Sequence, residues 1–492
     1  MTDVTDTAAA STTTTPLARP DYGLADALWA AHGQVFLSGT QALLRLLVMQ
    51  RARDAAAGWA TQGFVSGYRG SPLGGVDQAI WRAGQRLSDA GIRFLPAINE
   101  ELAATAVLGT QRVEADPERS CDGVFALWYG KGPGVDRAGD ALKHGHAYGS
   151  SPHGGVLMVA GDDHGCVSSS MPHQSEQAFQ SWHAPVLSPA SVAEIVEFGL
   201  YGWALSRYSG AWVGLCAASE VVESGSTVDL DLINTRMAAW ADADTVRART
   251  GHRPPADGLH NRWPDLPSLQ IEARVHAKLD AVRAFAAVNR IDRVVVESPQ
   301  ARVGIVTAGK AHLDVLEVLR RLDVSAEALA AAGVRVLKLG LTYPVEPTGI
   351  AAFAAGLDEL LVIEEKGPVV EDQLRSLFYN APPGARPAIV GKTDRDGRPL
   401  LSALGELRPS RLIEALAAWL ARHCPALDRR GQVADFTVPA LLSNAADGVK
   451  RQPYFCAGCP HNTSTRVPEG SSAQAGIGCH FMASWMERGT SG

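Results

Sequence analysis

Three of the chain's seven cysteines lie close together near its C-terminal end, as Cys456, Cys459 and Cys479. Two thiolates that are two residues apart can bind one soft metal ion or one edge of a cluster, and a third thiolate adds a ligand. Zinc and iron–sulfur clusters both use such ligands, and His461 or His480 would complete a zinc site. The spacing favours a metal ion or a cluster, with a redox dithiol and unligated thiols as the alternatives.

A glycine-rich segment, GYRGSPLGG at 67–75, follows a predicted strand. The carboxyl ends of parallel strands are where α/β sheets bind ligands, so Ser71 and the neighbouring backbone amides could hold a carboxylate or a phosphate. The segment has neither a Walker lysine nor the dinucleotide-binding spacing. The structural alternative is an ordinary turn that joins a strand to a helix.

Three further segments carry polar and charged residues. Glu100 and Glu101 open a predicted helix, where acidic residues are also favoured for purely structural reasons. The segment WYGKGPGVDRAGDALKHGH at 128–146 places Lys131 among glycines that allow a ligand to approach closely. The segment AGDDHGCVSSSMPHQSEQ at 160–177 is a long polar loop after an apolar strand, a common place for a functional site.

The elements that must position these residues are strands alternating with helices. Residues 21–235 contain predicted strands at 63–66, 124–128, 156–160 and 212–216 and predicted helices at 100–113 and 191–208. Residues 301–425 contain four strand–helix units in series, beginning with RVGIVTAG and ending with PSRLIEALAAWLARH. Both patterns predict α/β domains built on mostly parallel sheets covered by helices.

The remaining segments connect or flank these two blocks. Residues 1–20 lack the charged and apolar regions of a secretory signal and are predicted to be a disordered tail. Residues 236–300 are predicted to be a connector and residues 426–449 a linker. Residues 450–492 are too few to bury an α/β core of their own, so they are predicted to begin a third domain.

Composition excludes several classes of protein. With 45 basic and 52 acidic residues, the formal charge of −7 argues against a general nucleic-acid binder and against attachment to an anionic membrane surface. No apolar run approaches the roughly 18 residues of a membrane span. Seven unevenly placed cysteines make no disulfide framework and indicate a reducing, cytoplasmic setting.

Several motifs in one order indicate a family. They are SGYRGSPLGG, NEELAATAVLGTQ, WYGKGPGVDRAGD, DDHGCVSSS, VIEEK, FCAGCPHNTSTRVPEGS and GIGCHFMASWMER. Over residues 22–490 the chain resembles indolepyruvate ferredoxin oxidoreductase in its long, fused bacterial form. This family belongs to the thiamine-diphosphate-dependent 2-oxoacid:ferredoxin oxidoreductases.

The resemblance implies an architecture and a reaction. Residues 21–235 would be a pyrimidine-binding domain, residues 301–425 a transketolase C-terminal-like domain, and residues 450–492 the truncated start of a diphosphate-binding domain. The implied reaction is the oxidative decarboxylation of an aryl 2-oxo acid such as indolepyruvate. Coenzyme A would accept the acyl group and ferredoxin the electrons.

The resemblance also implies roles for individual residues. The family places a catalytic glutamate against the aminopyrimidine ring of thiamine diphosphate, which is Glu100 here, with Glu101 as the less favoured register. Ser71 matches a hydroxyl that lies near the substrate in the family's Tyr-Pro-x-Thr-Pro loop, although Arg69 stands where that loop has proline. The other implied cofactor-binding residues are Gly70, Lys131 and Gly132. In relatives with a [4Fe-4S] cluster near thiamine, cysteines that match Cys456, Cys459 and Cys479 hold it.

One family motif falls outside this sequence. The acidic Gly-Asp/Glu-Gly motif that holds Mg²⁺ on the diphosphate would begin just after Met486-Glu487-Arg488. We therefore expect a chain that is incomplete for catalysis alone and that needs a second copy or a partner chain for the missing half. The alternatives are an inactive truncated chain, a chain that serves assembly only, and a metal-binding interaction module.

Overall fold

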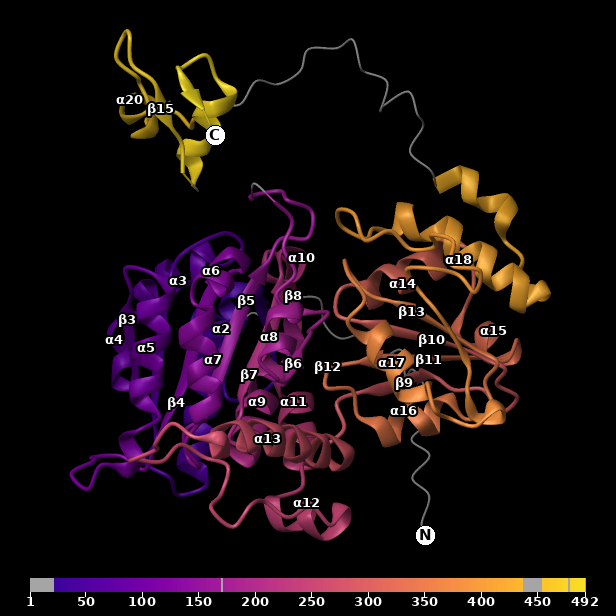
Figure 1. Cartoon of the computed structure of the whole chain (residues 1–492), viewed down its shortest axis with the longest axis horizontal. Coiled ribbons are helices and arrows are strands. Elements are labelled where there is room, and N and C mark those ends of the chain that lie inside the picture. Colours follow the sequence, from indigo (N-terminus) through magenta and orange to yellow (C-terminus); the bar gives the residue numbers. More distant parts are fainter. Residues whose placement is uncertain (1–21, 170, 437–453, 477, 492) are drawn as a thin grey trace.

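The computed structural model describes residues 22–169, 171–436, 454–476 and 478–491 (Figure 1). The predicted disordered tail at 1–20 and residues 437–449 of the predicted linker lie outside the described residues. Two α/β units make up most of the described chain. Figure 1 shows the first unit in indigo to magenta and the second unit in orange.

The first unit is built on a seven-stranded sheet with the order β12-β6-β7-β5-β4-β2-β3. All neighbouring strands are parallel except β12 and β6. The central strands are buried along their length, which is expected when helices cover both faces of a parallel sheet. The strands are β2 (Gln62–Gly67), β3 (Ile92–Pro96), β4 (Val124–Lys131), β5 (Val156–Asp162), β6 (Val186–Leu187), β7 (Trp212–Ala218) and β12 (Leu341–Tyr343).

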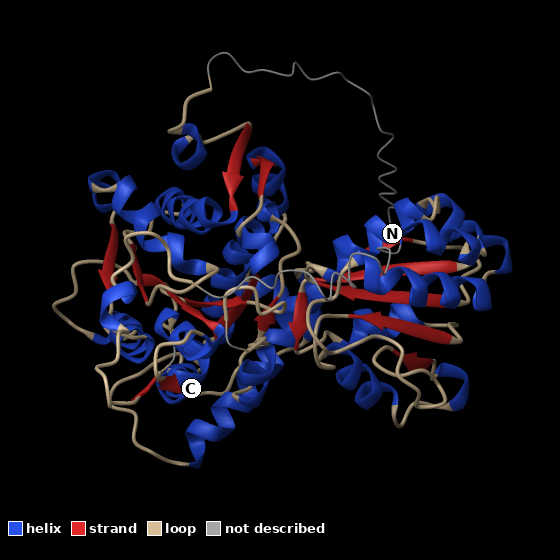
Figure 2. Cartoon of the chain, turned by 90° about the horizontal axis from the view of Figure 1, so that it is seen from above, coloured by secondary structure: helices blue, strands red, loops and turns tan. Residues whose placement is uncertain are grey.

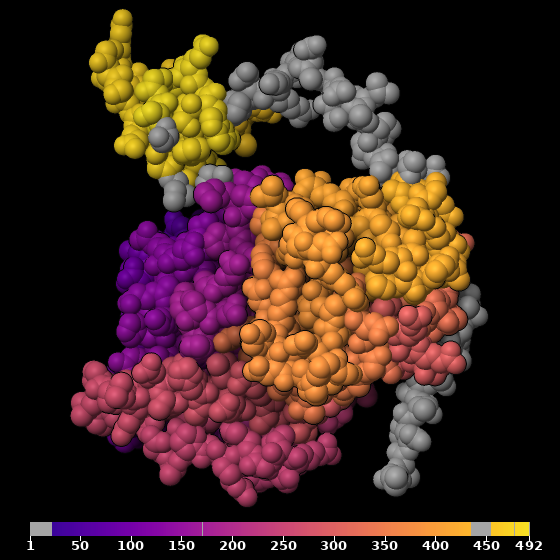
Figure 3. Space-filling view, turned by 45° about the vertical axis from the view of Figure 1, so that its right-hand side comes forward, coloured from indigo at the N-terminus to yellow at the C-terminus, as the bar shows by residue number. Residues whose placement is uncertain are grey.

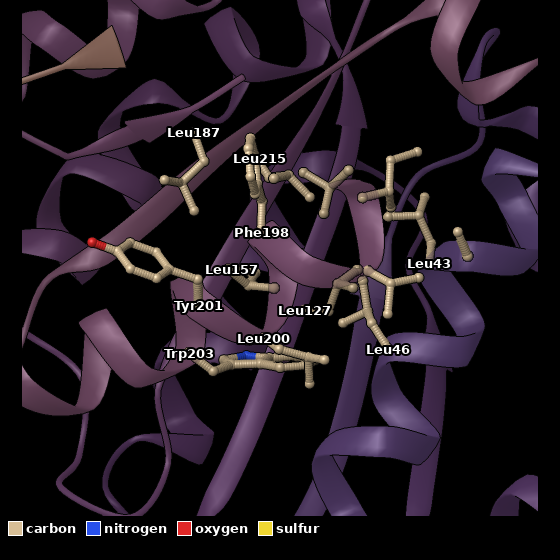
Figure 4. Close-up of a cluster of buried hydrophobic side chains, with 14 of the residues drawn as sticks. Leu43, Leu46, Leu127, Leu157, Leu187, Phe198, Leu200, Tyr201, Trp203 and Leu215 are labelled. Carbon is tan, nitrogen blue, oxygen red and sulfur yellow. The ribbon is translucent and has the colours of Figure 1, made fainter. Parts of the chain in front are cut away.

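Alternate residues of these strands enter different cores. On β4, Leu127 packs with helices α2 (Gly39–Ala56) and α9 (Val192–Ser209), whereas Trp128 packs on the opposite face. Figure 4 shows the first of these cores, in which Phe198, Trp203 and leucines from the sheet lie together. Each fully buried leucine or aromatic side chain stabilises the fold by about 1.5–3 kcal/mol.

The second unit has a five-stranded sheet with the order β14-β13-β10-β11-β9, in which only β9 is antiparallel to its neighbour. Helices α14 and α18 share one core with the sheet, and α16 and α17 share another. Figure 2 shows strands between helices in this layered arrangement. The elements are β9 (Arg293–Val296), β10 (Val303–Ala308), α14 (Ala311–Arg321), α15 (Ala326–Ala331), β11 (Val334–Leu339), α16 (Pro347–Ala354), β13 (Glu359–Ile363), α17 (Val370–Phe378), β14 (Ala388–Val390) and α18 (Pro409–His423).

Smaller elements complete the described chain. Two short antiparallel strands, β1 (Gln34–Ser38) and β8 (Gly225–Asp229), pair beside the first unit, and a parallel pair, β15 (Ala473–Gln474) and β16 (Thr490–Ser491), lies in the C-terminal segment. The remaining helices are α1 (Asp26–Trp29), α3 (Val76–Ala83), α4 (Gln85–Asp89), α5 (Glu100–Thr110), α6 (Gly132–Arg137), α7 (Gly139–Tyr148), α8 (Glu176–Ser181), α10 (Ser219–Val222), α11 (Leu230–Ala238), α12 (Ala243–Thr250), α13 (Leu269–Val288) and α20 (His461–Ser464). No helix of the described chain is both long and apolar enough to cross a membrane.

The predicted fold class, α/β with parallel sheets, is confirmed. The predicted domain ranges stay predictions, and two short strands cross them. β9 falls in the predicted connector but pairs with β11 of the second sheet, and β12 falls in the second block but pairs with β6 of the first. In the space-filling view of Figure 3 the orange surface of the second unit lies directly against the magenta surface of the first.

Candidate functional site

The candidate site lies at the edge of the first sheet where the parallel strands β2, β4, β5 and β7 end. The loops after these strands lie close to one another. A Cβ atom on Gly70 would be 3.2 Å from Cβ of Lys131, and one on Gly161 would be 2.8 Å from Cγ of Leu73. The segments that the sequence predicted to carry chemistry, at 67–75, 128–146 and 160–177, therefore meet at one edge.

Glu100 is the first residue of α5, and its side chain is only 13% exposed. Asn99 caps this helix, because its side-chain oxygen accepts a hydrogen bond from the Leu102 N–H at 2.8 Å. The backbone carbonyl of Glu100 accepts a hydrogen bond from the Trp128 indole N–H at 2.9 Å, which ties the helix start to β4. Glu101, by contrast, is exposed. The structure thus separates the two candidate glutamates, and only Glu100 is directed into the protein.

Gly130, near the end of β4, and Gly134, in α6, form a close-fitting cradle around Glu100. A Cβ atom on Gly134 would lie 2.6 Å from Oε1 of Glu100, and one on Gly130 would lie 3.4 Å from its Cγ. A Cβ on Gly132 would lie 2.2 Å from Nδ1 of His173. These glycines are needed because the backbone approaches other groups closely, which a side chain would prevent.

The carboxylate of Glu100 has one ion-pair partner among the described residues, the guanidinium of Arg137 at 3.8 Å. That distance is too long for a direct hydrogen bond. The carboxylate oxygens are therefore held in place by packing and remain able to accept a hydrogen bond from a ligand.

The loop with Ser71 is anchored through its neighbours. The Ser71 hydroxyl donates a long hydrogen bond of 3.5 Å to Oε1 of Glu223. The Arg69 guanidinium lies 3.5 Å from Oδ2 of Asp77 and over the ring of Trp81. Arg69, the residue that departs from the family loop, is therefore held against helix α3.

Lys131 ends β4 and binds the loop that follows β5. Its Nζ donates a hydrogen bond to the carbonyl of Ser168 at 2.6 Å. Burial lowers the pKa of Lys131, and the nearby Asp163 carboxylate opposes this shift. Burial alone would raise the pKa of Asp163, but hydrogen bonds from the backbone N–H groups of Ser168 and Val167 lower it overall. This region thus holds a fixed positive charge beside a fixed negative one.

His173 is a residue of this edge that the sequence did not single out. Its Nε2 lies 2.8 Å from the Asp136 carboxylate, and its Nδ1 lies 3.5 Å from the buried Asp162 carboxylate. Burial would lower the pKa of His173, but these two carboxylates raise it to about 9. The only sequence signal is its place in the polar loop at 160–177, because its two partners lie on different elements.

The three cysteines of the C-terminal segment do not form a group whose sulfur atoms all lie within 4.8 Å of one another in the described structure. Cys456 and Cys479 are exposed, and Sγ of Cys459 lies 3.3 Å from Nδ1 of His461. Within the described residues, one group of three metal-binding side chains has ligand atoms within 4.8 Å of one another, and it is Asp162, Glu176 and Cys216 instead. A metal or cluster at the C-terminal cysteines stays a prediction.

The fold has a counterpart of known structure, the 2-oxoglutarate:ferredoxin oxidoreductase from Magnetococcus marinus. The similarity covers 79% of this chain and 65% of that chain, with a TM-score of 0.53 and 17% sequence identity. At this identity the match shows the fold alone. The chain has the α/β fold of a 2-oxoacid:ferredoxin oxidoreductase.

Sequence comparisons match indolepyruvate oxidoreductases. Residues 293–434 match the family model of the indolepyruvate oxidoreductase domain. The chain is 26% identical over 469 residues to the indolepyruvate oxidoreductase subunit IorA of Pyrococcus abyssi and 24% identical over 473 residues to that of Thermococcus kodakarensis. Each match covers 92% of this chain, and the chain spans 63% of the length of each relative. The predicted resemblance to the indolepyruvate oxidoreductase family is confirmed.

Proposed function

We propose that this chain supplies the pyrimidine-binding side of a thiamine diphosphate site in an indolepyruvate oxidoreductase. The whole enzyme would oxidatively decarboxylate an aryl 2-oxo acid such as indolepyruvate. The observation that carries the proposal is the Glu100 carboxylate, held at the start of α5 in a cradle of glycines and free of a direct hydrogen-bond partner among the described residues.

The residues of the cradle fit an aminopyrimidine ring. A flat ring needs close backbone approach, which Gly130 and Gly134 allow, and it needs one carboxylate at a ring nitrogen, which Glu100 offers. Glu100 would accept a hydrogen bond there and hold a proton at that nitrogen. When bound, thiamine diphosphate supplies the electron sink that decarboxylation of a 2-oxo acid requires.

The other residues of the edge would orient ligands. Lys131, with Gly132 and Gly70 beside it, would place positive charge near an anionic group of the cofactor or substrate. The Ser71 hydroxyl would donate a hydrogen bond to the substrate, in exchange for its long contact with Glu223. Glu101 is exposed, so it would not take part in the cradle.

The remaining parts of the reaction would come from beyond this chain. The relatives are longer than the matched part and are named as subunits, so the rest of such a chain, a partner chain or a second copy would hold Mg²⁺ and the diphosphate. Coenzyme A and ferredoxin would be the acceptors, in a cytoplasmic enzyme. The thiol chemistry of Cys456, Cys459 and Cys479 suits a [4Fe-4S] cluster, and we derive no electron path through them.

The test compares thiamine diphosphate binding to Glu100→Gln and Glu101→Gln by calorimetry in the presence of Mg²⁺. Because a hydrogen bond to a charged group contributes about 1.5–3 kcal/mol, Glu100→Gln should weaken binding about tenfold or more. Glu101→Gln should bind like the unaltered chain. Equal affinities for both variants would contradict the proposal. If the chain binds nothing alone, the same pair is compared in a complex with a co-expressed partner subunit.

A further inference from the structure

A small polar pocket lies between the two α/β units, on the inner side of the loop after β5. The first unit lines it with Asp162, His164, Glu176 and Cys216, and the second with Lys310 and Glu364 among others. Its interior volume is about 30 Å³. Since roughly 10–15 Å³ accommodates one water, the pocket has room for an ion or a water or two, and not for an organic ligand.

Three metal-binding side chains converge in this pocket. The ligand atoms of Asp162, Glu176 and Cys216 all lie within 4.8 Å of one another. The sheet explains part of this arrangement. Cys216 on β7 is opposite Ala160 on β5, and Asp162 lies two residues further along β5, so both side chains point to the same face. Glu176, the first residue of α8, reaches them from the loop that returns over this face.

Two neighbouring polar groups lack partners. His164 is only 5% exposed, and neither of its ring nitrogens has a hydrogen-bond partner within the described chain. Oε2 of Glu176 is also buried and has no such partner. Buried nitrogen and oxygen atoms are normally hydrogen-bonded, so several unpaired ones that line one small pocket point to an occupant.

Acidic side chains outnumber basic ones around the pocket. Asp162, Glu176, Glu364 and Glu365 line it, while the lysine that lines it is Lys310. The Lys310 ammonium is already engaged, at 2.7 Å from Asp314 and 3.2 Å from Glu365. Lys310 is therefore paired within the second unit, and the cationic group beside Asp162 is instead the His173 imidazole, whose Nδ1 lies 3.5 Å from the carboxylate.

We propose that Asp162, Glu176 and Cys216 bind one divalent cation of the zinc class, in a pocket that the unpartnered imidazole of His164 also lines. A thiolate, an imidazole and carboxylates are donors that zinc takes, whereas Mg²⁺ and Ca²⁺ prefer oxygen donors alone. The thiol proton leaves as the thiolate binds. Because the pocket lies at the joint between the units and has no room for an organic ligand, the ion would have a structural role.

The surroundings of Asp162 fit this role. Its carboxylate accepts hydrogen bonds from the Ser175 backbone N–H at 2.9 Å and from the Ser175 hydroxyl at 2.6 Å. Such bonds orient a metal-binding carboxylate, and their loss typically lowers metal affinity about 10–100-fold.

The experiment must separate this site from the C-terminal cysteines. A background variant with Cys456→Ser, Cys459→Ser and Cys479→Ser is titrated with Co²⁺ alone, and thiolate-to-cobalt charge-transfer absorption is recorded. One ion per chain should bind with this absorption. Adding Cys216→Ser should abolish the absorption, while adding Cys424→Ser should not. Cys424 is the matched control because it is equally buried but packs in the core of the second unit.

Two further variants keep the test decisive. Ser175→Ala should lower Co²⁺ affinity about 10–100-fold and leave the thiolate absorption intact, because it acts through Asp162. If Cys216→Ser fails to fold by circular dichroism, Glu176→Gln replaces it, with lost affinity expected. Absence of a bound ion in the cysteine-free background, or absorption that survives Cys216→Ser, would overturn the proposal. Neither outcome bears on thiamine diphosphate, since Glu100 and Lys131 are unchanged throughout.

Discussion

The carboxyl edges of the two parallel sheets differ in what occupies them. At the first edge, Gly130 and Gly134 leave space around the Glu100 carboxylate, whose nearest cation is 3.8 Å away. At the second edge, the Lys310 ammonium lies within 3.2 Å of carboxylates on three separate segments. The same strand–helix architecture thus leaves a ligand-accepting group at one edge and fills the other with its own ion pairs.

The difference shows which features make a sheet edge a candidate site. Polar residues alone do not, because Glu364 and Glu365 are as polar as Glu100 but are already engaged. Glu364 accepts hydrogen bonds from the backbone N–H groups of Val369 and Val370, and Glu365 from that of Leu407. What distinguishes the first edge is a carboxylate without a direct partner, flanked by glycines.

The largest expected effect concerns the carboxyl edge of the second sheet, where Lys310 lies. Lys310→Met would leave Asp314 and Glu365 buried without their cation, whereas Glu406 would keep its ion pair with Arg408. Removing one partner of a buried ion pair costs about 3–5 kcal/mol, so the free energy of unfolding in urea should fall by that amount. The exposed Lys143→Met is the control and should change it by about 0.5 kcal/mol or less. A small loss at Lys310 would mean that the edge is not held by this network.

The next effect is a pH dependence at the same edge. His312 of α14 is buried beside Thr307, and burial, with Lys338 as a secondary cause, lowers the pKa of His312 from 6.5 to about 4. Between pH 4 and 6.5, His312 is therefore protonated in the unfolded chain and neutral in the folded chain. The resulting stability is present above pH 6.5 and is lost as the pH falls toward 4, by about 3 kcal/mol in all.

The measurement is urea unfolding of the chain and of His312→Gln between pH 4 and 7. Below pH 6.5, the free energy of unfolding of His312→Gln should fall less steeply with falling pH than that of the unaltered chain. The exposed His144→Gln should leave the slope unchanged. An unaltered slope in His312→Gln would assign the acid sensitivity to other groups.

The smallest expected effect concerns the carboxyl edge of the first sheet, where Glu100 lies. Gly134→Ala would place a Cβ atom 2.6 Å from Oε1 of Glu100, and the end of this flexible side chain would shift to avoid it. We expect stability to change by about 1 kcal/mol or less, while thiamine diphosphate binding weakens about tenfold because the carboxylate leaves its position. Gly384→Ala, where a Cβ atom would meet nothing within 4 Å, should bind normally. Unchanged binding in Gly134→Ala would argue against the cradle.

Much of the fold follows from local sequence patterns. Helices α9 and α18 begin and end within a residue or two of their predicted bounds, because their periodicity and end signals are local. The short strands β9 and β12 were not predicted. Their pairing depends on distant strands, and four or fewer residues carry too little periodicity to reveal it.

The candidate site likewise has features that the sequence predicted and features that only the tertiary structure shows. Motifs identified the Glu100–Glu101 pair, but the helix phase and the fold of α6 over α5 separate the buried residue from the exposed one. Spacing singled out Cys456, Cys459 and Cys479, whose sulfur atoms do not all lie within 4.8 Å of one another among the described residues. The group that does converge draws on β5, α8 and β7, and no spacing rule connects residues so far apart in sequence.

By itself, then, the sequence determined the α/β class, the principal strands and helices, the segments that meet at the first sheet's edge, and the family resemblance. These depend on periodicity, turn residues and motifs, which are properties of neighbouring residues. Only the tertiary structure decided which glutamate is enclosed, which carboxylates are already paired, and that Asp162, Glu176 and Cys216 share a pocket. Those outcomes depend on packing between distant segments, because burial and the distances between charges exist only once the sheets and helices have assembled.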